Sequence, residues 1–141
     1  MEIEYLALKI SVEEPLVSFE LREKYLLVIG NSKRDNFKDM VIVSEMVYAK
    51  ALETKSRYLL MYYRSLYINL NMNEAVNIVK RSEAVQPQFK RFTVAAVVGP
   101  SGVEFGQFWR HLAAQRGFNV EVFEDFDKAE NWLMEQIRKI K

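Results

Sequence analysis

The sequence predicts an α/β protein: a mixed, mostly parallel sheet of about five strands, with an N-terminal antiparallel pair and about four helices on its faces. Two observations predict this class. From residue 37 onward, short apolar runs alternate with segments of three- and four-residue apolar spacing, and such alternation buries a largely parallel sheet under helices joined by right-handed crossovers. Before residue 31, two apolar runs flank three polar residues, which indicates a hairpin.

The chain has the size and balance of one globular domain. It has 141 residues, of which 50% are hydrophobic and 28% charged, so we expect residues 1–141 to form a single domain with an ample core. The 20 Lys and Arg residues nearly cancel the 19 Asp and Glu residues, and this weak net charge gives no reason to expect nucleic acid as a partner. The absence of cysteine excludes disulfides and thiolate nucleophiles.

The N-terminal stretch MEIEYLALKISVEEP is acidic and interrupted by charge. It differs from the basic start and apolar stretch of a secretory signal. No apolar segment of the sequence approaches the roughly 18 residues that span a bilayer, so we expect a cytoplasmic protein without a membrane span. Residues 3–10 fit a further extended segment, with a break marked by Pro15.

Five segments have the pattern of a strand: residues 16–21, 25–29, 57–63, 92–98 and 119–123. The first alternates between apolar and polar residues and is joined to the second by a polar turn, so these two form the antiparallel pair. The third and fourth are apolar throughout, which suits strands covered by helices on both faces. The fifth is a short last strand.

Four segments have apolar side chains at helical spacing, and these helices begin near residues 37, 72, 103 and 126. Short polar side chains precede three of them and can accept hydrogen bonds from first-turn amides. These caps are Asp35 or Asn36 for the first helix, Asn71 with Glu74 as a capping box for the second, and Asp125 for the last. Gly117 ends the third helix.

The stretch AAVVGPSGVEFGQFW, residues 95–109, has the order strand, glycine turn and helix that also begins a phosphate-binding loop. It lacks the Lys and the following Ser or Thr of a P-loop, and its glycine spacing differs from that of the dinucleotide fingerprint. A turn that needs positive φ accounts for the glycines without a ligand. There remains a helix N-terminus whose amides at Ser101 and Gly102 can receive a small anion.

Few residues have the chemistry of an active site. His111 is the only histidine, so no histidine cluster can bind a metal, and its spacing from the apolar stripe places it on the polar face of its helix. Ser65 and Ser101 follow predicted strands, but neither lies in a G-x-S-x-G nucleophile elbow. We therefore expect no catalytic residues, no metal and no cofactor.

Two clusters of charge allow a functional and a structural interpretation. Four acids gather at the last strand-to-helix junction: Glu121, Glu124, Asp125 and Asp127. Such carboxylates can act as general acids and bases or bind magnesium, but helix capping accounts for them more simply.

Four basic residues flank SEAVQPQF: Lys80, Arg81, Lys90 and Arg91. They suit single-stranded nucleic acid, but a solvated loop has the same composition.

The end of the chain resembles a known family. The stretch VEVFEDFDKAENWL, preceded by FKRFTVAAVVG, is similar to the end of the STAS-like domains, the family of SpoIIAA-like anti-sigma-factor antagonists. In that family a strand of the AVV type precedes a helix, a short strand ending in Phe, and a capped helix with Ala and Trp-Leu. The corresponding residues here are 95–98, Phe123, Ala129 and 132–133. The motifs cover roughly the C-terminal third, and the order of elements matches over nearly the whole chain.

The resemblance implies a small α/β domain that works as a non-enzymatic interaction module. Some members of the family are switched by phosphorylation of a serine at the start of the helix after the third strand. This sequence reads NLNMN at residues 69–73, without serine or threonine. We therefore do not expect a phosphate-dependent switch of that type.

Two functions from different classes remain open. The first is a non-catalytic regulatory or protein-interaction domain, with another protein or a second copy of the chain, as a homodimer, for its partner. The second is a small-ligand binding domain, for a lipid or an anion or nucleotide, that uses the carboxyl edge of the sheet. Ligands generally bind at that edge in open α/β sheets. The residues that we expect there are Tyr63, Arg64, Ser65, Tyr67, Ser101 and Gly102.

Overall fold

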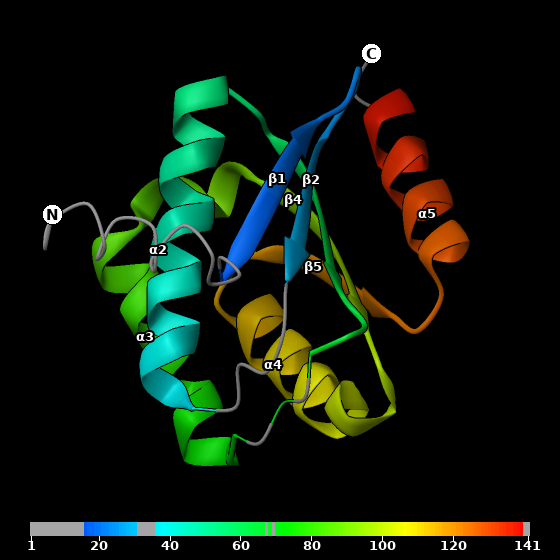
Figure 1. The fold of residues 1–141 in the computed structure, drawn as a ribbon. Helices are drawn as coiled ribbons and strands as arrows, with labels where there is room; N and C mark the ends of the chain where they lie inside the picture. Colours follow the sequence, from blue (N-terminus) through cyan, green and yellow to red (C-terminus); the bar gives the residue numbers. More distant parts are fainter. Residues whose placement is uncertain (1–15, 31–35, 67, 69, 140–141) are drawn as a thin grey trace, which may run out of the picture.

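The structure is a computed structural model that describes residues 16–30, 36–66, 68 and 70–139. These residues form one five-stranded sheet with the strands in chain order. Its strands are β1 (Val17–Leu21), β2 (Leu26–Gly30), β3 (Tyr58–Tyr63), β4 (Thr93–Val98) and β5 (Asn119–Phe123). The first pair is antiparallel and all other neighbours are parallel, so the predicted mixed sheet is confirmed (Figure 1).

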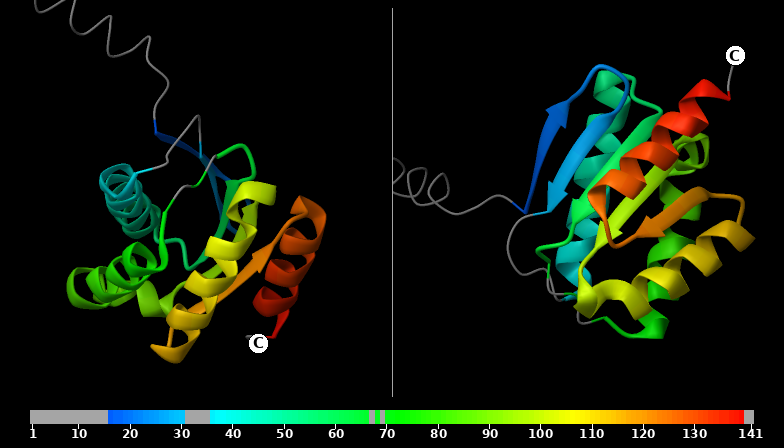
Figure 2. Two further views of the ribbon diagram at one scale, coloured as in Figure 1. Left: turned by 90° about the horizontal axis from the view of Figure 1, so that it is seen from below. Right: turned by 90° about the vertical axis from the view of Figure 1, so that its right-hand side faces the viewer.

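Four α-helices connect and cover these strands: α2 (Phe37–Thr54), α3 (Met72–Val85), α4 (Val103–Gln115) and α5 (Phe126–Arg138). Two 3₁₀ turns, η1 (Pro87–Arg91) and η2 (Pro100–Gly102), precede β4 and α4. Helices α2, α3 and α4 lie on one face of the sheet and α5 lies on the other (Figure 2). Within the described ranges, no helix is both long and apolar enough to cross a membrane.

The sheet separates two apolar cores, and β4 contributes to both. Val94 and Ala96 face α2, α3 and α4, whereas Ala95 and Val97 face α5. All six residues of β4 are buried, which explains why this segment is apolar throughout instead of alternating. The prediction of a strand covered on both faces is confirmed.

Three predicted caps are present in the structure. The side chain of Asn36 accepts a hydrogen bond from a first-turn amide of α2, and Asp125 does the same for α5. Asn71 and Glu74 form the reciprocal capping box at the start of α3. Asp35, the alternative cap of α2, and the extended segment predicted over residues 3–10 lie outside the described residues.

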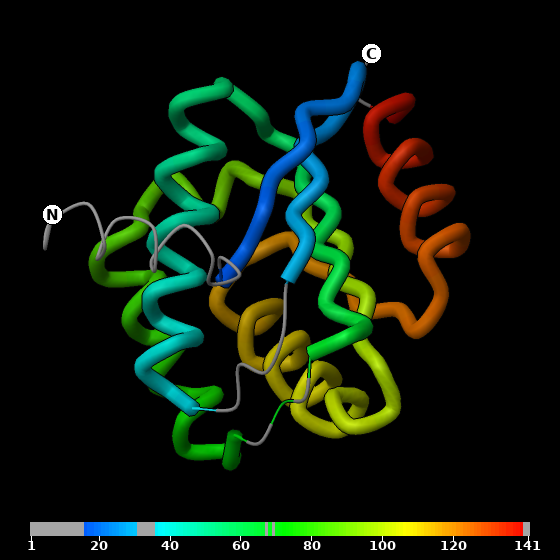
Figure 3. Tube along the Cα trace, viewed as in Figure 1, coloured from blue at the N-terminus to red at the C-terminus, as the bar shows by residue number. Residues whose placement is uncertain are grey.

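The reason given for the glycines after β4 is wrong. Gly99 and Gly102 have φ values of −88° and −105°, so neither needs the left-handed region. A Cβ on Gly99 would instead collide with the carbonyl oxygen of Arg64, and one on Gly102 would lie 3.0 Å from Cδ1 of Ile68. The loops that follow β3 and β4 approach closely at the same end of the sheet (Figure 3). Positive φ occurs at Gly117 (87°), which ends α4 as predicted.

Candidate functional site

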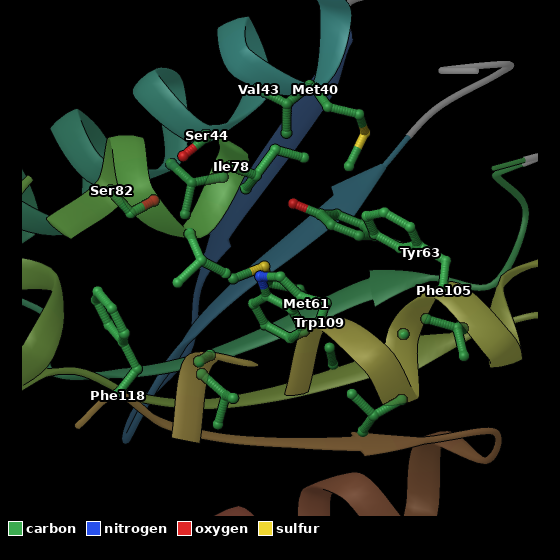
Figure 4. Close-up of a pocket in the computed structure, with 18 of the residues that line it drawn as sticks. Met40, Val43, Ser44, Met61, Tyr63, Ile78, Ser82, Phe105, Trp109 and Phe118 are labelled. Carbon is green, nitrogen blue, oxygen red and sulfur yellow. The ribbon is translucent and has the colours of Figure 1, made fainter. Parts of the chain in front are cut away.

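An apolar cavity of about 100 Å³ lies between the sheet and helices α2, α3 and α4 (Figure 4). Its floor includes Met61, Ala96 and Val122, which are register neighbours on β3, β4 and β5. Side chains of all three helices cover it: Met40, Val43 and Val47 from α2, Ile78 and Val79 from α3, and Phe105, Trp109 and Ala113 from α4. These apolar surroundings favour an apolar ligand.

Small residues shape this cavity. Ala96 lies in the middle of the floor, between larger neighbours on the adjacent strands. Gly106 lets α4 lie close to the sheet, because a Cβ there would be only 3.2 Å from Cγ1 of Val122. Protein interiors contain few voids larger than a water molecule, so a cavity of this size is a distinct feature of this core.

Tyr63, the last residue of β3, places a hydroxyl group in this cavity. Only 7% of the residue is exposed, and the hydroxyl points inward in Figure 4. The hydroxyl has no hydrogen-bond partner among the residues that the structure describes. Burial raises the pKa of Tyr63, so the phenol stays neutral and can donate or accept a hydrogen bond. Gly30 gives the ring room, since a Cβ there would lie 2.7 Å from Cδ1 of Tyr63.

The hydroxyl of Ser44 is another polar group in the wall of the cavity. The hydroxyl of Ser44, which lines the cavity from α2, donates to Oε1 of Gln86 at 3.2 Å. Gln86 is 2% exposed, and its Nε2 has no partner within the described ranges. Buried side-chain amides are usually paired, so this corner adds an unused donor next to the cavity wall. The cavity is therefore apolar with polar atoms at two of its sides.

A more polar depression of about 420 Å³ lies outside the cavity, at the carboxyl edge of the sheet. Its lining includes Asn71 at the start of α3, together with Ser101 and Glu104 at the start of α4. Ile68 and Phe105 line both the depression and the cavity. These two side chains therefore separate the interior space from the surface.

The structure divides the predicted site residues between these places. Tyr63 lines the cavity and Ser101 lines the outer depression. Arg64 is exposed and its Nη1 donates to the carbonyl oxygen of Glu124 at 2.8 Å, which ties two loops together. Ser65 is exposed and lines neither space. Tyr67 lies outside the described residues.

The amide of Gly102 is already used within the protein. It donates to the carbonyl oxygen of Gly99 at 2.9 Å, closing η2, and the residue is buried. An anion site at this turn would need a free amide at that position. The turn therefore has fewer free amides for an anion than the sequence predicted, because the amide of Gly102 is not available.

The comparisons with known proteins bear on the fold. No family model matches the sequence, and no curated protein matches it. Among solved structures, the chain is similar to that of an uncharacterised protein of the DUF3478 family from Shewanella loihica PV-4, described as having a SpoIIAA-like fold. The two are 19% identical, with 83% of this chain and 91% of that chain covered and a TM-score of 0.52.

The chain has a SpoIIAA-like fold. This confirms the fold that the resemblance of the C-terminal third implied. At the start of the helix after the third strand of this SpoIIAA-like fold, Asn71 accepts from the Glu74 amide at 2.8 Å and donates its own amide to Oε1 of Glu74 at 3.0 Å. A capping box thus occupies the start of this helix, in line with the expectation from the sequence that no serine or threonine stands there.

The other candidate groups have structural partners or are solvated in this SpoIIAA-like fold. His111 is exposed, as predicted. Glu121 forms an ion pair with Arg110. Asp125 caps α5. Among the residues described, no group of three or more His, Asp or Glu side chains is arranged to hold a metal ion.

Two of the four basic residues around SEAVQPQF pair with acids. Arg81 contacts Glu45 at 2.9 Å, and Lys90 contacts Glu83 at 3.2 Å. Hydrogen bonds from Lys90 and then from Arg116 lower the pKa of Glu83. The segment is therefore partly neutralised within the protein, as expected of a solvated surface.

Sequence reasoning missed most of the cavity lining. Phe105 and Trp109 were expected to be part of an ordinary buried helix stripe, and nothing in their spacing distinguishes a filled core from a hollow one. The available signal was the set of small residues Ala96, Gly106 and Ala113, which all face the same core. Where small residues from a strand and a helix meet, large neighbours must fill the gap or leave a space.

Proposed function

We propose that this protein is a non-catalytic binding protein for a small, largely apolar ligand held between the sheet and α2, α3 and α4. The unpaired Tyr63 hydroxyl inside the apolar cavity carries this proposal. Burial of a hydroxyl without a hydrogen bond costs roughly 1–3 kcal/mol in proteins. A ligand with one polar atom opposite Tyr63 removes that cost.

The cavity volume limits the part of the ligand that is buried. An engineered apolar cavity of about 150 Å³ binds benzene, so by proportion a cavity of about 100 Å³ holds about four carbon atoms. A larger ligand must extend out of the cavity, and the outer depression, which shares Ile68 and Phe105 with the cavity, is the adjacent space. The ligand is therefore a small molecule or a molecule with a short buried chain.

The regulatory or protein-interaction role stays a prediction with less support from the geometry. Large exposed apolar side chains mark partner surfaces when they form one patch. In the described ranges they are Leu21, Leu52, Met72 and Val85. They belong to β1, to α2 and to the two ends of α3, so no single element presents them.

Two tryptophans make the test specific, because they lie on opposite faces of the sheet. Trp109 lines the cavity, whereas Trp132 packs against Phe123 in the core beneath α5. Butan-1-ol, whose chain matches the volume of the cavity, should shift the indole N–H signal of Trp109 in the ¹⁵N-labelled protein and leave that of Trp132 in place. The variant Trp132→Phe assigns the two signals.

Neighbouring alanines supply a matched pair of variants for the same titration. Ala113 lines the cavity and is buried, and Ala114 beside it is exposed. Ala113→Leu should fill the space and abolish the response to butan-1-ol, whereas Ala114→Leu should respond as the natural protein does. An unmoved Trp109 signal in the natural protein, or an equal response in Ala113→Leu, would refute the proposal.

A further inference from the structure

The outer depression and the cavity together form a two-part space. Ile68 and Phe105 line both, so a chain that passes between these side chains connects the apolar interior with the polar surface. The interior accepts apolar groups, and the depression presents Ser101, Asn71 and Glu104 to solvent. A ligand that uses both parts is amphipathic.

The charge of the depression is negative. Glu104 is the one charged residue among the described residues that line it. No hydrogen bond or ion pair joins its carboxylate to the described part of the chain. A carboxylate without a cationic partner repels an anionic headgroup and attracts a cationic one.

Three backbone amides near the depression are already used within the protein. The amide of Asn71 donates to Glu74, that of Glu74 donates to Asn71, and that of Gly102 donates to Gly99. Helix N-termini attract anions through unused first-turn amides. These three amides are therefore not available to a phosphate or a carboxylate.

We propose that the ligand is an amphiphile whose short, largely apolar chain enters the cavity between Ile68 and Phe105 with one polar atom opposite Tyr63, and whose uncharged or cationic polar end lies in the depression beside Glu104. This inference rests on the proposed function and adds the class of headgroup. Glu104 acts as the residue that selects against anionic ligands.

Three six-carbon probes with different headgroups test the inference: hexan-1-ol, hexan-1-amine and hexanoate at pH 7. Their affinities follow from the indole N–H shift of Trp109, with Trp132 as the internal reference. Hexan-1-ol and hexan-1-amine should bind at least about fivefold more tightly than hexanoate, the ratio expected for one unit charge at about 4 Å in water. Equal affinity for hexanoate and hexan-1-ol would overturn the inference.

A matched pair of charge variants locates the effect. Glu104→Gln should bring the affinity for hexanoate to within about twofold of that for hexan-1-ol. Asp127→Asn removes the same charge from the first turn of α5, which covers the other face of the sheet, and should leave the ratio unchanged. The same change in both variants would also overturn the inference.

The butan-1-ol titration separates the two levels of failure. If butan-1-ol moves the Trp109 signal but none of the six-carbon probes does, the route between Ile68 and Phe105 is wrong and the apolar binding site stands. If neither butan-1-ol nor the probes move the signal, the proposed function itself fails.

Discussion

At the scale of single residues, two buried tyrosines differ in what their hydroxyl groups do. Tyr25 donates to Oε2 of Glu130 at 2.5 Å, whereas the hydroxyl of Tyr63 faces the cavity without a described partner. A structural hydroxyl stabilises the folded chain through its hydrogen bond, and an unpaired one costs free energy until a ligand pairs with it. The two residues therefore form a natural comparison.

The first prediction concerns removal of each hydroxyl in the absence of ligand. Tyr25→Phe should lower the free energy of unfolding by about 1.5 kcal/mol, because a hydrogen bond to a charged group is lost. Tyr63→Phe should raise it by about 1 kcal/mol, because a buried unpaired hydroxyl is removed. Urea unfolding of both variants measures the difference. A clear loss of stability in Tyr63→Phe would mean that its hydroxyl serves the fold.

The second prediction concerns alkaline pH. Burial, and then the hydrogen bond to Glu130, raises the pKa of Tyr25 to about 12, and burial raises the pKa of Tyr63. Both phenols are thus favoured in the neutral form when folded, whereas a tyrosine in the unfolded chain ionises near pH 10. Their contribution to stability is fully present below pH 10 and is lost as the pH rises through the folded pKa.

The expected slope follows from proton linkage. Between pH 10 and pH 12 the free energy of unfolding should fall by about 1.4 kcal/mol per pH unit for each of the two tyrosines. Urea unfolding at half-unit steps of pH measures this slope. The variant Tyr63→Phe should lack the part of the slope that ionisation of Tyr63 contributes. The same slope in the variant and the natural protein would show that Tyr63 does not stay neutral in the fold.

At the scale of elements, the turn between β4 and α4 depends on close approach of two loops. Gly99 has a φ value open to any residue, but a Cβ there would collide with the carbonyl oxygen of Arg64. Gly99→Ala should therefore lower the free energy of unfolding by about 1–3 kcal/mol through overpacking. Differential scanning calorimetry of the variant and the natural protein measures this loss of stability. An unchanged melting temperature would show that the loops after β3 and β4 are free to separate.

Ser101→Ala is the control for this turn. Ser101 is exposed, and the change keeps a Cβ while removing only the hydroxyl. Substitutions of this kind at the surface usually alter stability by less than about 0.5 kcal/mol. A loss in Gly99→Ala that Ser101→Ala does not share therefore belongs to the loop contact.

At the scale of the whole molecule, the sequence predicted the sheet and the helices well, because those depend on local patterns. The continuous apolar run that became β4 and the caps at Asn36, Asn71 and Asp125 are signals that the chain carries within a few residues. The cavity depends on how three helices pack over one sheet. The stripe that includes Phe105 and Trp109 has the same spacing whether the space beside it is filled or empty, so the sequence pattern could not reveal the site.

The grouping of candidate residues at one edge was predicted only in part. The prediction that Tyr63 and Ser101 lie near the carboxyl ends of β3 and β4 followed from strand order. Strand order does not say which side chains point inward, and the structure places Tyr63 inside and Arg64 outside. That separation arises from alternation along β3 as the strand ends.

Filling the cavity should stabilise the empty molecule as a whole. Ala113→Leu adds apolar atoms to a space that is open without ligand, and cavity-filling changes commonly raise the free energy of unfolding by about 0.5–2 kcal/mol. Ala114→Leu, on the exposed side of the same helix, should change it little. A marked loss in Ala113→Leu would mean that this part of the core is already close-packed.

The most direct measurement of the central claim is mass spectrometry of the protein isolated under non-denaturing conditions from cells that make it. The natural protein and Ala114→Leu should each carry a small, largely apolar molecule that organic solvent releases, and Ala113→Leu should carry none. No bound molecule in any of the three proteins, or equal amounts in all of them, would contradict a ligand held between the sheet and α2, α3 and α4.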